Sequence, residues 1–121
     1  MNDNILVFSL AIIVIILILT VAFYLKRKRL KTNYVFWRKD KIRCRYFLDY
    51  KGRRQGEEAF YFRNGKVNKK RFWENDLLNG ESQIFYTTGE LYIRCFYKDS
   101  GLDGTCTIYT KDQRVIKSEV Y

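Results

Sequence analysis

The chain has 121 residues, enough for one small domain and little else. It has no histidine, no proline and three cysteines, and its 23 lysines and arginines outnumber its 13 aspartates and glutamates. Without histidine, and with Cys44, Cys95 and Cys106 forming neither a CxxC motif nor an even set, the composition argues against a histidine-based triad, a zinc finger and a disulfide-stapled toxin.

An uncharged apolar stretch occupies residues 5–25, and only Ser9 and Thr20 interrupt it. At ~1.5 Å per residue, a helix of this length covers the ~30 Å hydrocarbon core of a bilayer. A cleaved signal peptide is the alternative, but the first four residues are not positive, and no small-residue cleavage site follows the stretch. We therefore predict that residues 1–25 are an uncleaved transmembrane anchor.

The orientation of this anchor follows from residues 26–31, of which five are basic. The positive-inside rule places the part after the span in the cytoplasm and the N-terminal residues outside. Free thiols at Cys44, Cys95 and Cys106 would fit a reducing compartment. We expect a single-pass protein whose C-terminal domain lies in the cytoplasm.

Positive charge gathers in the middle of the chain. Residues 26–71 contain 18 basic and 4 acidic residues, whereas residues 72–121 contain 5 and 8. Basic side chains close to a bilayer attract anionic headgroups at about 1 kcal/mol each. We predict that segment 26–55 is a basic juxtamembrane segment with a degenerate first hairpin. Its candidate headgroup contacts are Lys26, Arg27, Lys28, Arg29, Lys31, Arg38, Lys39, Arg43 and Arg45. Nucleic acid is a less favoured partner for this segment, because the anchor keeps it beside lipid.

The rest of the chain repeats with a period of 24 residues, in units 56–79, 80–103 and 104–121. Each unit predicts two strands joined by a turn. Asn64-Gly65 predicts a two-residue turn with both central residues at positive φ, and Thr88-Gly89 keeps the glycine. Asp112-Gln113 has lost it, so we expect a looser third turn. The predicted fold is a single transmembrane helix followed by an all-β domain, an open antiparallel sheet of stacked hairpins.

Strand alternation assigns faces to the side chains of these hairpins. Glu57 and Glu58 are neighbours on one strand and should point to opposite sides. Most aromatic side chains should pack against the sheet, but a single open sheet cannot bury both of its faces, so some should stay accessible to a partner. The candidate partner surface is formed by Tyr61, Phe85, Tyr109, Trp73 and Tyr97.

Two long motifs carry a resemblance to a known family. The pattern Gly56…Phe60-Tyr61…Asn64-Gly65-Lys66…Trp73 recurs as Gly80…Phe85-Tyr86…Gly89-Glu90-Leu91…Tyr97, and residues 104–121 form a weaker copy. This pattern resembles the MORN-repeat superfamily, specifically its bacterial variant, the YwqK-type antitoxin repeat. The resemblance implies a sheet of stacked hairpins, no catalysis, and an antitoxin or membrane-scaffold role in a bacterial cell. The anchor and Gln113 depart from the family pattern.

We found no phosphate-binding loop, dinucleotide fingerprint, metalloprotease motif, nucleophile elbow or calcium loop. We therefore predict no enzyme activity and no catalytic, cofactor-binding or metal-binding residues. The sequence favours a membrane-anchored interaction module in the bacterial cell membrane whose protein partner, in the antitoxin interpretation, is a toxin. The alternative is a lipid-binding or envelope-associated scaffold. In either case membrane contact should map to residues 26–54 and partner contact to residues 56–121.

Overall fold

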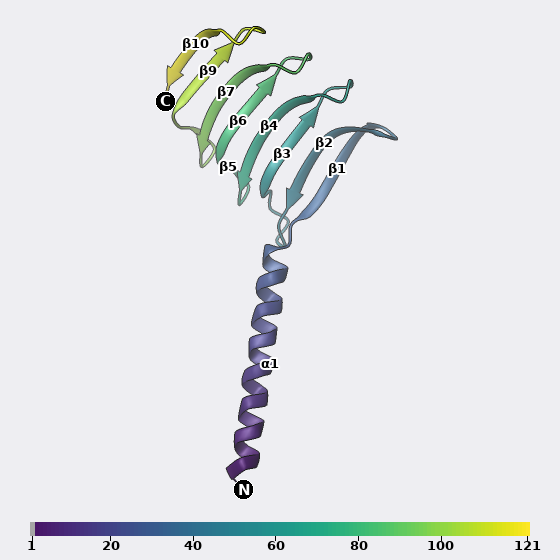
Figure 1. Ribbon diagram of the computed structural model, residues 1–121, viewed down its shortest axis with the longest axis vertical. Helices are drawn as coiled ribbons and strands as arrows, with labels where there is room; N and C mark the ends of the chain where they lie inside the picture. The colour runs from purple at the N-terminus through teal and green to yellow at the C-terminus, as the bar shows by residue number, and fades with distance from the viewer. Residues whose placement is uncertain (1) are drawn as a thin grey trace.

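The computed structural model describes residues 2–121 as one helix followed by an open antiparallel sheet (Figure 1). The helix, α1, spans Asn2–Lys28. The strands are β1 Lys31–Arg38, β2 Lys41–Leu48, β3 Gly56–Tyr61, β4 Val67–Glu74, β5 Leu77–Leu78, β6 Gly80–Phe85, β7 Leu91–Lys98, β8 Gly101–Leu102, β9 Thr105–Tyr109 and β10 Val115–Val120. The predicted fold class, a helix followed by an all-β domain, is confirmed.

Helix α1 is apolar on every side and projects from the sheet without packing along it (Figure 1). None of its residues is buried, and Lys26, Arg27 and Lys28 form its last turn. A core helix of a soluble protein would bury one side against its neighbours. Within residues 2–121, α1 is the one helix long and apolar enough to cross a membrane.

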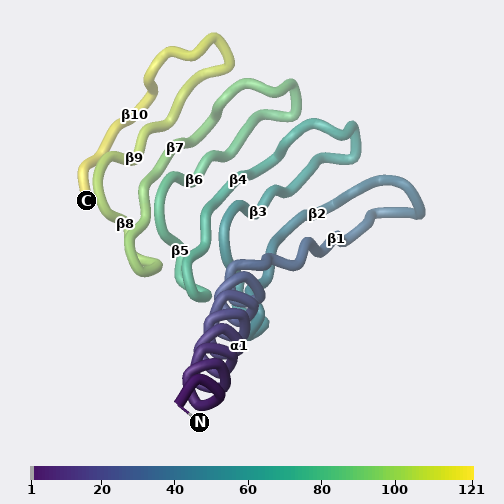
Figure 2. Tube along the Cα trace, turned by 60° about the horizontal axis from the view of Figure 1, so that its bottom comes forward, coloured from purple at the N-terminus to yellow at the C-terminus, as the bar shows by residue number. Residues whose placement is uncertain are grey.

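The main sheet runs in chain order, β1-β2-β3-β4-β6-β7-β9-β10, with β5 beside β4 and β8 beside β7. All of the paired strands are antiparallel, and the register repeats every 24 residues: Gly56 pairs with Trp73, and Gly80 pairs with Tyr97. Strands β1 and β2 form the first hairpin, as expected for segment 26–55. Figure 2 shows the hairpins arching side by side, with their tips all at the same end.

The turns at these tips differ from the prediction. In the second hairpin, the N–H of Gly65 donates to the carbonyl of Phe62 (3.0 Å), and the N–H of Phe62 donates to that of Lys66 (2.8 Å). Asn64 does not have a positive φ, whereas Gly65 does (86°). The loop therefore has three residues, a tight turn followed by a left-handed residue, and the predicted two-residue turn is wrong.

The turn of the last repeat unit, at the tip of the fourth hairpin (β9–β10), is not looser, contrary to the sequence-based expectation. Gln113 takes the left-handed position with φ 64°, and its N–H donates to the carbonyl of Thr110 (3.0 Å), as Gly65 and Gly89 do in their turns. The side-chain amide of Gln113 also donates to the carbonyl of Leu91 in β7 (3.0 Å). This bond to the neighbouring hairpin holds a conformation that glutamine alone disfavours.

True two-residue turns occur at the opposite, base end of the hairpins. Asn75-Asp76 joins β4 to β5, and Asp99-Ser100 joins β7 to β8, all four residues having positive φ. Each base turn is bound to the unit before it. The N–H of Asp76 donates to the carbonyl of Arg54 (3.1 Å), and the N–H of Ser100 to that of Leu78 (2.9 Å). Successive units are therefore joined through their turns as well as their strands.

The structure differs from the expectation of three free thiols at two of the cysteines. A disulfide joins Cys95 in β7 to Cys106 in β9, and among the described residues only Cys44 is a free cysteine. The sequence did not reveal this pair, because the total number of cysteines is odd and the two partners come from different repeat units. The strand register places them opposite each other, with Cα atoms 4.2 Å apart.

The single-layer sheet has a very small core. Among residues 2–121 the buried side chains are those of Cys44, Ala59, Cys95 and Glu58. Glu57 and Glu58 do point to opposite sides, since Glu57 forms an ion pair with Arg45 while Glu58 joins a separate cluster. Most other side chains of the inner strands are half-buried, so both faces of the sheet remain open.

Candidate functional site

The helix end and the loop 49–55 form a collar at the base of the sheet. The ring of Phe23 in α1 lies edge-on to that of Tyr50, with centroids 6.4 Å apart, and the ammonium of Lys51 lies 5.7 Å from the Tyr50 ring. Asp49 orders the loop by accepting hydrogen bonds from the backbone N–H groups of Lys51 and Arg53. A hollow of about 450 Å³ lies between loop and helix.

The collar changes the set of basic residues expected at the membrane. Lys26, Arg27 and Lys28 form the last turn of α1, and Arg29 and Lys31 follow it directly. Lys51 and Arg53 join them from the loop and were not predicted. Their signal in the sequence was the Asp-Tyr-Lys-Gly-Arg stretch between β2 and β3, whose turn brings it back to the helix. Asp49, although partly desolvated, has its pKa lowered by the hydrogen bonds from Arg53 and Lys51.

The other predicted headgroup contacts lie farther along the first hairpin. Arg38 and Lys39 are at its tip, about 23 Å from Lys31 at ~3.3 Å per residue, and this tip points away from the helix (Figure 1). Arg43 and Arg45 lie on β2 between the two ends. Arg45 is paired with Glu57, and the guanidinium of Arg43 lies over the Trp37 ring. The structure therefore does not bring the nine residues together.

The predicted partner surface separates into two aromatic rows, at opposite ends of the hairpins. Tyr61, Phe85 and Tyr109 are the last residues of β3, β6 and β9, at the tip end. Trp73 and Tyr97 lie near the ends of β4 and β7, at the base, each opposite a glycine of positive φ. All five side chains are half-buried.

Within the sheet, the most exposed apolar side chains are on the edge strands. Tyr34 and Phe36 in β1 are each 50% exposed, and Val120 in β10 is 81% exposed. An inner strand has a neighbour on each side that covers part of its side chains, while an edge strand has one. The repeat pattern predicts the same exposure for side chains at equivalent positions of every unit, so it did not predict this difference between edge and inner strands.

A buried carboxylate cluster lies where the first hairpin (β1–β2) meets the second (β3–β4). The side chain of Glu58 is 1% exposed and accepts bonds from the guanidinium groups of Arg54 and Arg71. The indole N–H of Trp73 donates to its Oε2 atom at 2.8 Å. The Arg54 guanidinium also lies over Tyr46 at 4.6 Å, and that of Arg71 over Phe60 at 5.4 Å. Such a fully partnered charge fixes the geometry of the sheet.

Two further groups on this face have shifted pKa values. Burial raises the pKa of the Cys44 thiol above its ordinary 9.0, with nearby Arg54 and Arg71 opposing the shift. Burial also lowers the pKa of Lys69, with the charge of Arg71 adding to the effect. The Cys44 side chain pairs across the strands with Phe60, which explains its low exposure. Neither the Glu58 cluster nor this buried thiol was predicted, since each is assembled from several strands.

The sheet thus offers a basic collar at the helix end, two aromatic rows and a rigid central cluster. Comparison with known proteins gives no match to a family model, a curated protein or a solved structure.

Proposed function

We propose that this chain is a non-enzymatic, membrane-anchored interaction module that presents its repeat sheet to a protein partner. The observation that supports this most directly is the open single layer. Few side chains are buried in it, and aromatic side chains remain half-exposed along its hairpins. Surfaces of this kind are used for binding rather than for enclosing a substrate.

The proposed location is the cytoplasmic side of a bacterial cell membrane, with α1 as the single span. Basic residues at the helix end support this orientation through the positive-inside rule. In the reducing cytoplasm Cys95 and Cys106 would be held as two facing thiols. We give more weight to the charge bias, because five basic residues in a run of six act directly on membrane insertion.

An antitoxin or immunity role is the specific form of this proposal, and it is supported by the sequence resemblance to YwqK-type repeats. Site-specific photocrosslinking in intact cells tests the broader proposal. A photoreactive residue at Phe85 should capture one defined protein, whereas the same probe at the lipid-facing Ile15 should not. Equal labelling patterns at both positions, or no defined adduct at any of the five aromatic positions, would refute a partner surface on the repeats.

A second candidate function is a lipid-binding scaffold, and the collar favours it. Lys51 adds positive charge beside the helix end, whereas Arg53 is paired with Asp49 in the same loop. Tyr50 contacts Phe23 at the level where the span ends. Aromatic and basic side chains are the usual residues at a membrane interface. In nanodiscs, anionic lipid should slow hydrogen exchange in loop 49–55 relative to zwitterionic lipid. The tip loop 63–65 is the internal control and should be unaffected.

A further inference from the structure

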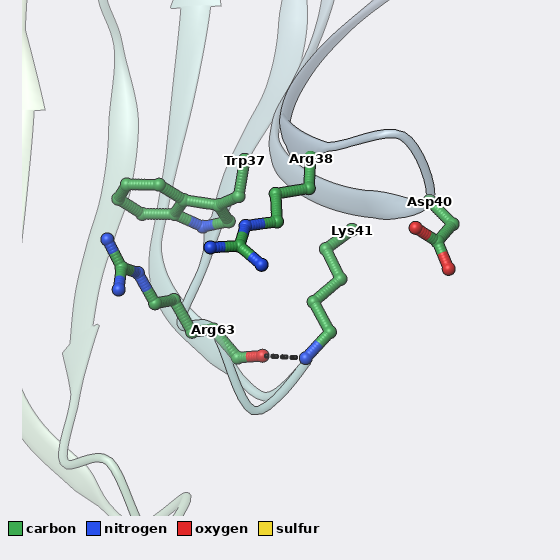
Figure 3. A pocket seen from close by; sticks show the side chains of 5 residues that line it. All are labelled: Trp37, Arg38, Asp40, Lys41 and Arg63. Atoms are coloured by element: carbon green, nitrogen blue, oxygen red, sulfur yellow. Dashed lines mark hydrogen bonds between the residues drawn. The ribbon is translucent and has the colours of Figure 1, made fainter.

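The tips of the first two hairpins enclose a basic, aromatic hollow that none of the functions above uses. It has a volume of about 500 Å³ and is lined by Trp37, Arg38, Asp40, Lys41 and Arg63 (Figure 3). The indole N–H of Trp37 donates to the carbonyl of Tyr61 (3.3 Å), and the ammonium of Lys41 to that of Arg63 (3.4 Å). These bonds join β1 and β2 to the end of β3, so the hollow is formed by two units together. We call it the tip cleft.

Three arginines at the tip cleft lack a carboxylate partner: Arg38 and Arg63 line it, and Arg43 lies beside it against Trp37. Residues 31–121 contain nine arginines, and six of them form ion pairs with an aspartate or glutamate. Within the described part of the chain the other three are Arg38, Arg43 and Arg63, and all three lie around Trp37. The guanidinium groups of Arg43 and Arg63 lie 4.7 Å and 5.1 Å from the Trp37 ring centre. Figure 3 shows Asp40 across the hollow from Trp37.

The cleft is lined by three cationic side chains and by one carboxylate, that of Asp40, so positive charge is in excess there. Like charges repel one another, and an anionic ligand would relieve that repulsion. Guanidinium groups match carboxylate oxygens with two parallel hydrogen bonds. We propose that the tip cleft binds an acidic segment of a protein partner, with Arg38, Arg43 and Arg63 pairing its carboxylates and Trp37 holding two of the arginines in place. This inference rests on the proposed function and names the chemistry of the partner.

Two other anionic partners fit the cleft less well. Lipid headgroups are about 23 Å away along β1 at ~3.3 Å per residue, well beyond a Debye length of ~8 Å. A nucleic acid would require an open aromatic face on which a base could stack. The ring of Trp37 already has two guanidinium groups against it, and its indole N–H is used by Tyr61.

The test uses the full chain in neutral detergent micelles and a fluorescein-labelled hexaglutamate peptide, followed by fluorescence anisotropy. Binding should weaken with added salt, and Arg43→Gln/Arg63→Gln should weaken it at least about tenfold, as expected for the loss of two charge-assisted contacts. The matched control, Lys98→Gln/Lys111→Gln, removes the same charge from exposed distal sites and should change binding less than about twofold. Retained burial of Cys44 against alkylation verifies that each variant is folded.

Equal weakening in the cleft variant and in the lysine control would show a general charge effect and would overturn the proposal. Tighter, arginine-dependent binding of a hexathymidylate oligonucleotide than of hexaglutamate would overturn the choice of an acidic peptide. Neither result would touch the proposed function, because a partner captured by crosslinking at Phe85 would also be captured by the cleft variant. If no partner were crosslinked at Phe85 while hexaglutamate still bound to the tip cleft, the proposed function would fail and the proposed binding of an acidic segment would stand.

Discussion

Glu58 is the residue whose surroundings contribute most clearly to the stability of the sheet. Its carboxylate is buried between two guanidinium groups and an indole N–H, so removing its charge leaves Arg54 and Arg71 facing each other. We expect Glu58→Gln to lower the free energy of unfolding by about 3 kcal/mol. Urea unfolding of the detergent-solubilised chain, followed by tryptophan fluorescence, measures this change.

Glu119→Gln is the control for this prediction. Glu119 pairs with Lys117, and both side chains are largely exposed, so the loss of unfolding free energy should be much smaller than that for Glu58→Gln. Equal losses for the two variants would mean that burial adds nothing to the Glu58 cluster.

Cys44 provides a second test at the residue scale. Because burial raises the pKa of its thiol, less thiolate is present near neutral pH than in an unfolded chain, and the side chain is also shielded from reagents. We expect iodoacetamide at pH 8 to modify Cys44 more than about tenfold more slowly in the folded chain than in urea.

The raised pKa of Cys44 also predicts that the free energy of unfolding falls as the pH rises above 9.0, since the folded state disfavours the thiolate.

At the scale of the element, the tip turns depend on one left-handed residue each. Gly65 has φ 86° and open space around the position of a Cβ atom, so Gly65→Ala introduces backbone strain without a clash. The expected loss is about 1 kcal/mol of unfolding free energy. Gly101→Ala is the matched control: its φ is not positive, and we expect a change within about 0.5 kcal/mol. Chemical denaturation that ranks Gly101→Ala as the more damaging change would contradict this account of the turn.

The same turns show what could be predicted from sequence at this scale. Glycine and polar residues marked the position of each turn correctly, because those residue types favour left-handed backbone. They did not distinguish a two-residue loop from a three-residue loop. That choice depends on strand register, and register is fixed by bonds such as the one from Gln113 to Leu91 in the next hairpin.

For the molecule as a whole, the helix, the 24-residue period and the open sheet were predictable because each depends on local pattern. The sites were less predictable because they join residues far apart in sequence. Arg38 was expected at the membrane but lies at a hairpin tip, while Lys51 was not predicted and lies beside the helix. The distribution of charge along the sequence does not show which end of a hairpin lies beside the helix. Only the direction in which β1 leaves α1 shows this (Figure 1).

Truncation tests whether the repeats are independent. Each hairpin contacts only its neighbours, so removing residues 104–121 should leave the first three hairpins folded. The rate of Cys44 alkylation should stay within about twofold of that in the full chain, because Cys44 lies several strands from the cut. Removal of residues 56–79 is the contrasting deletion, since it takes away Phe60 and Glu58 and should expose Cys44. Rapid Cys44 modification in both truncated chains would indicate a single cooperative unit.

The redox state of the cysteine pair reports on topology. If the sheet lies in the cytoplasm, we expect acid-quenched cells to yield Cys95 and Cys106 as two alkylated thiols. The chain purified in air should instead yield the linked pair and one free thiol, Cys44. A linked pair recovered directly from quenched cells would place the sheet on the oxidising side and contradict the proposed orientation.

The bonds between successive base turns have a consequence for how such a chain can change in length. Because Asp76 is held by Arg54 and Ser100 by Leu78, each unit supplies the attachment point for the next one. Within residues 2–121, β10 is an edge strand of the sheet. Duplication of one 24-residue unit at that edge would add two strands, about 10 Å at ~4.8 Å per strand, without altering the collar. The length of sheet that is available to a partner would then be a quantity set by the number of repeat units, in uniform steps.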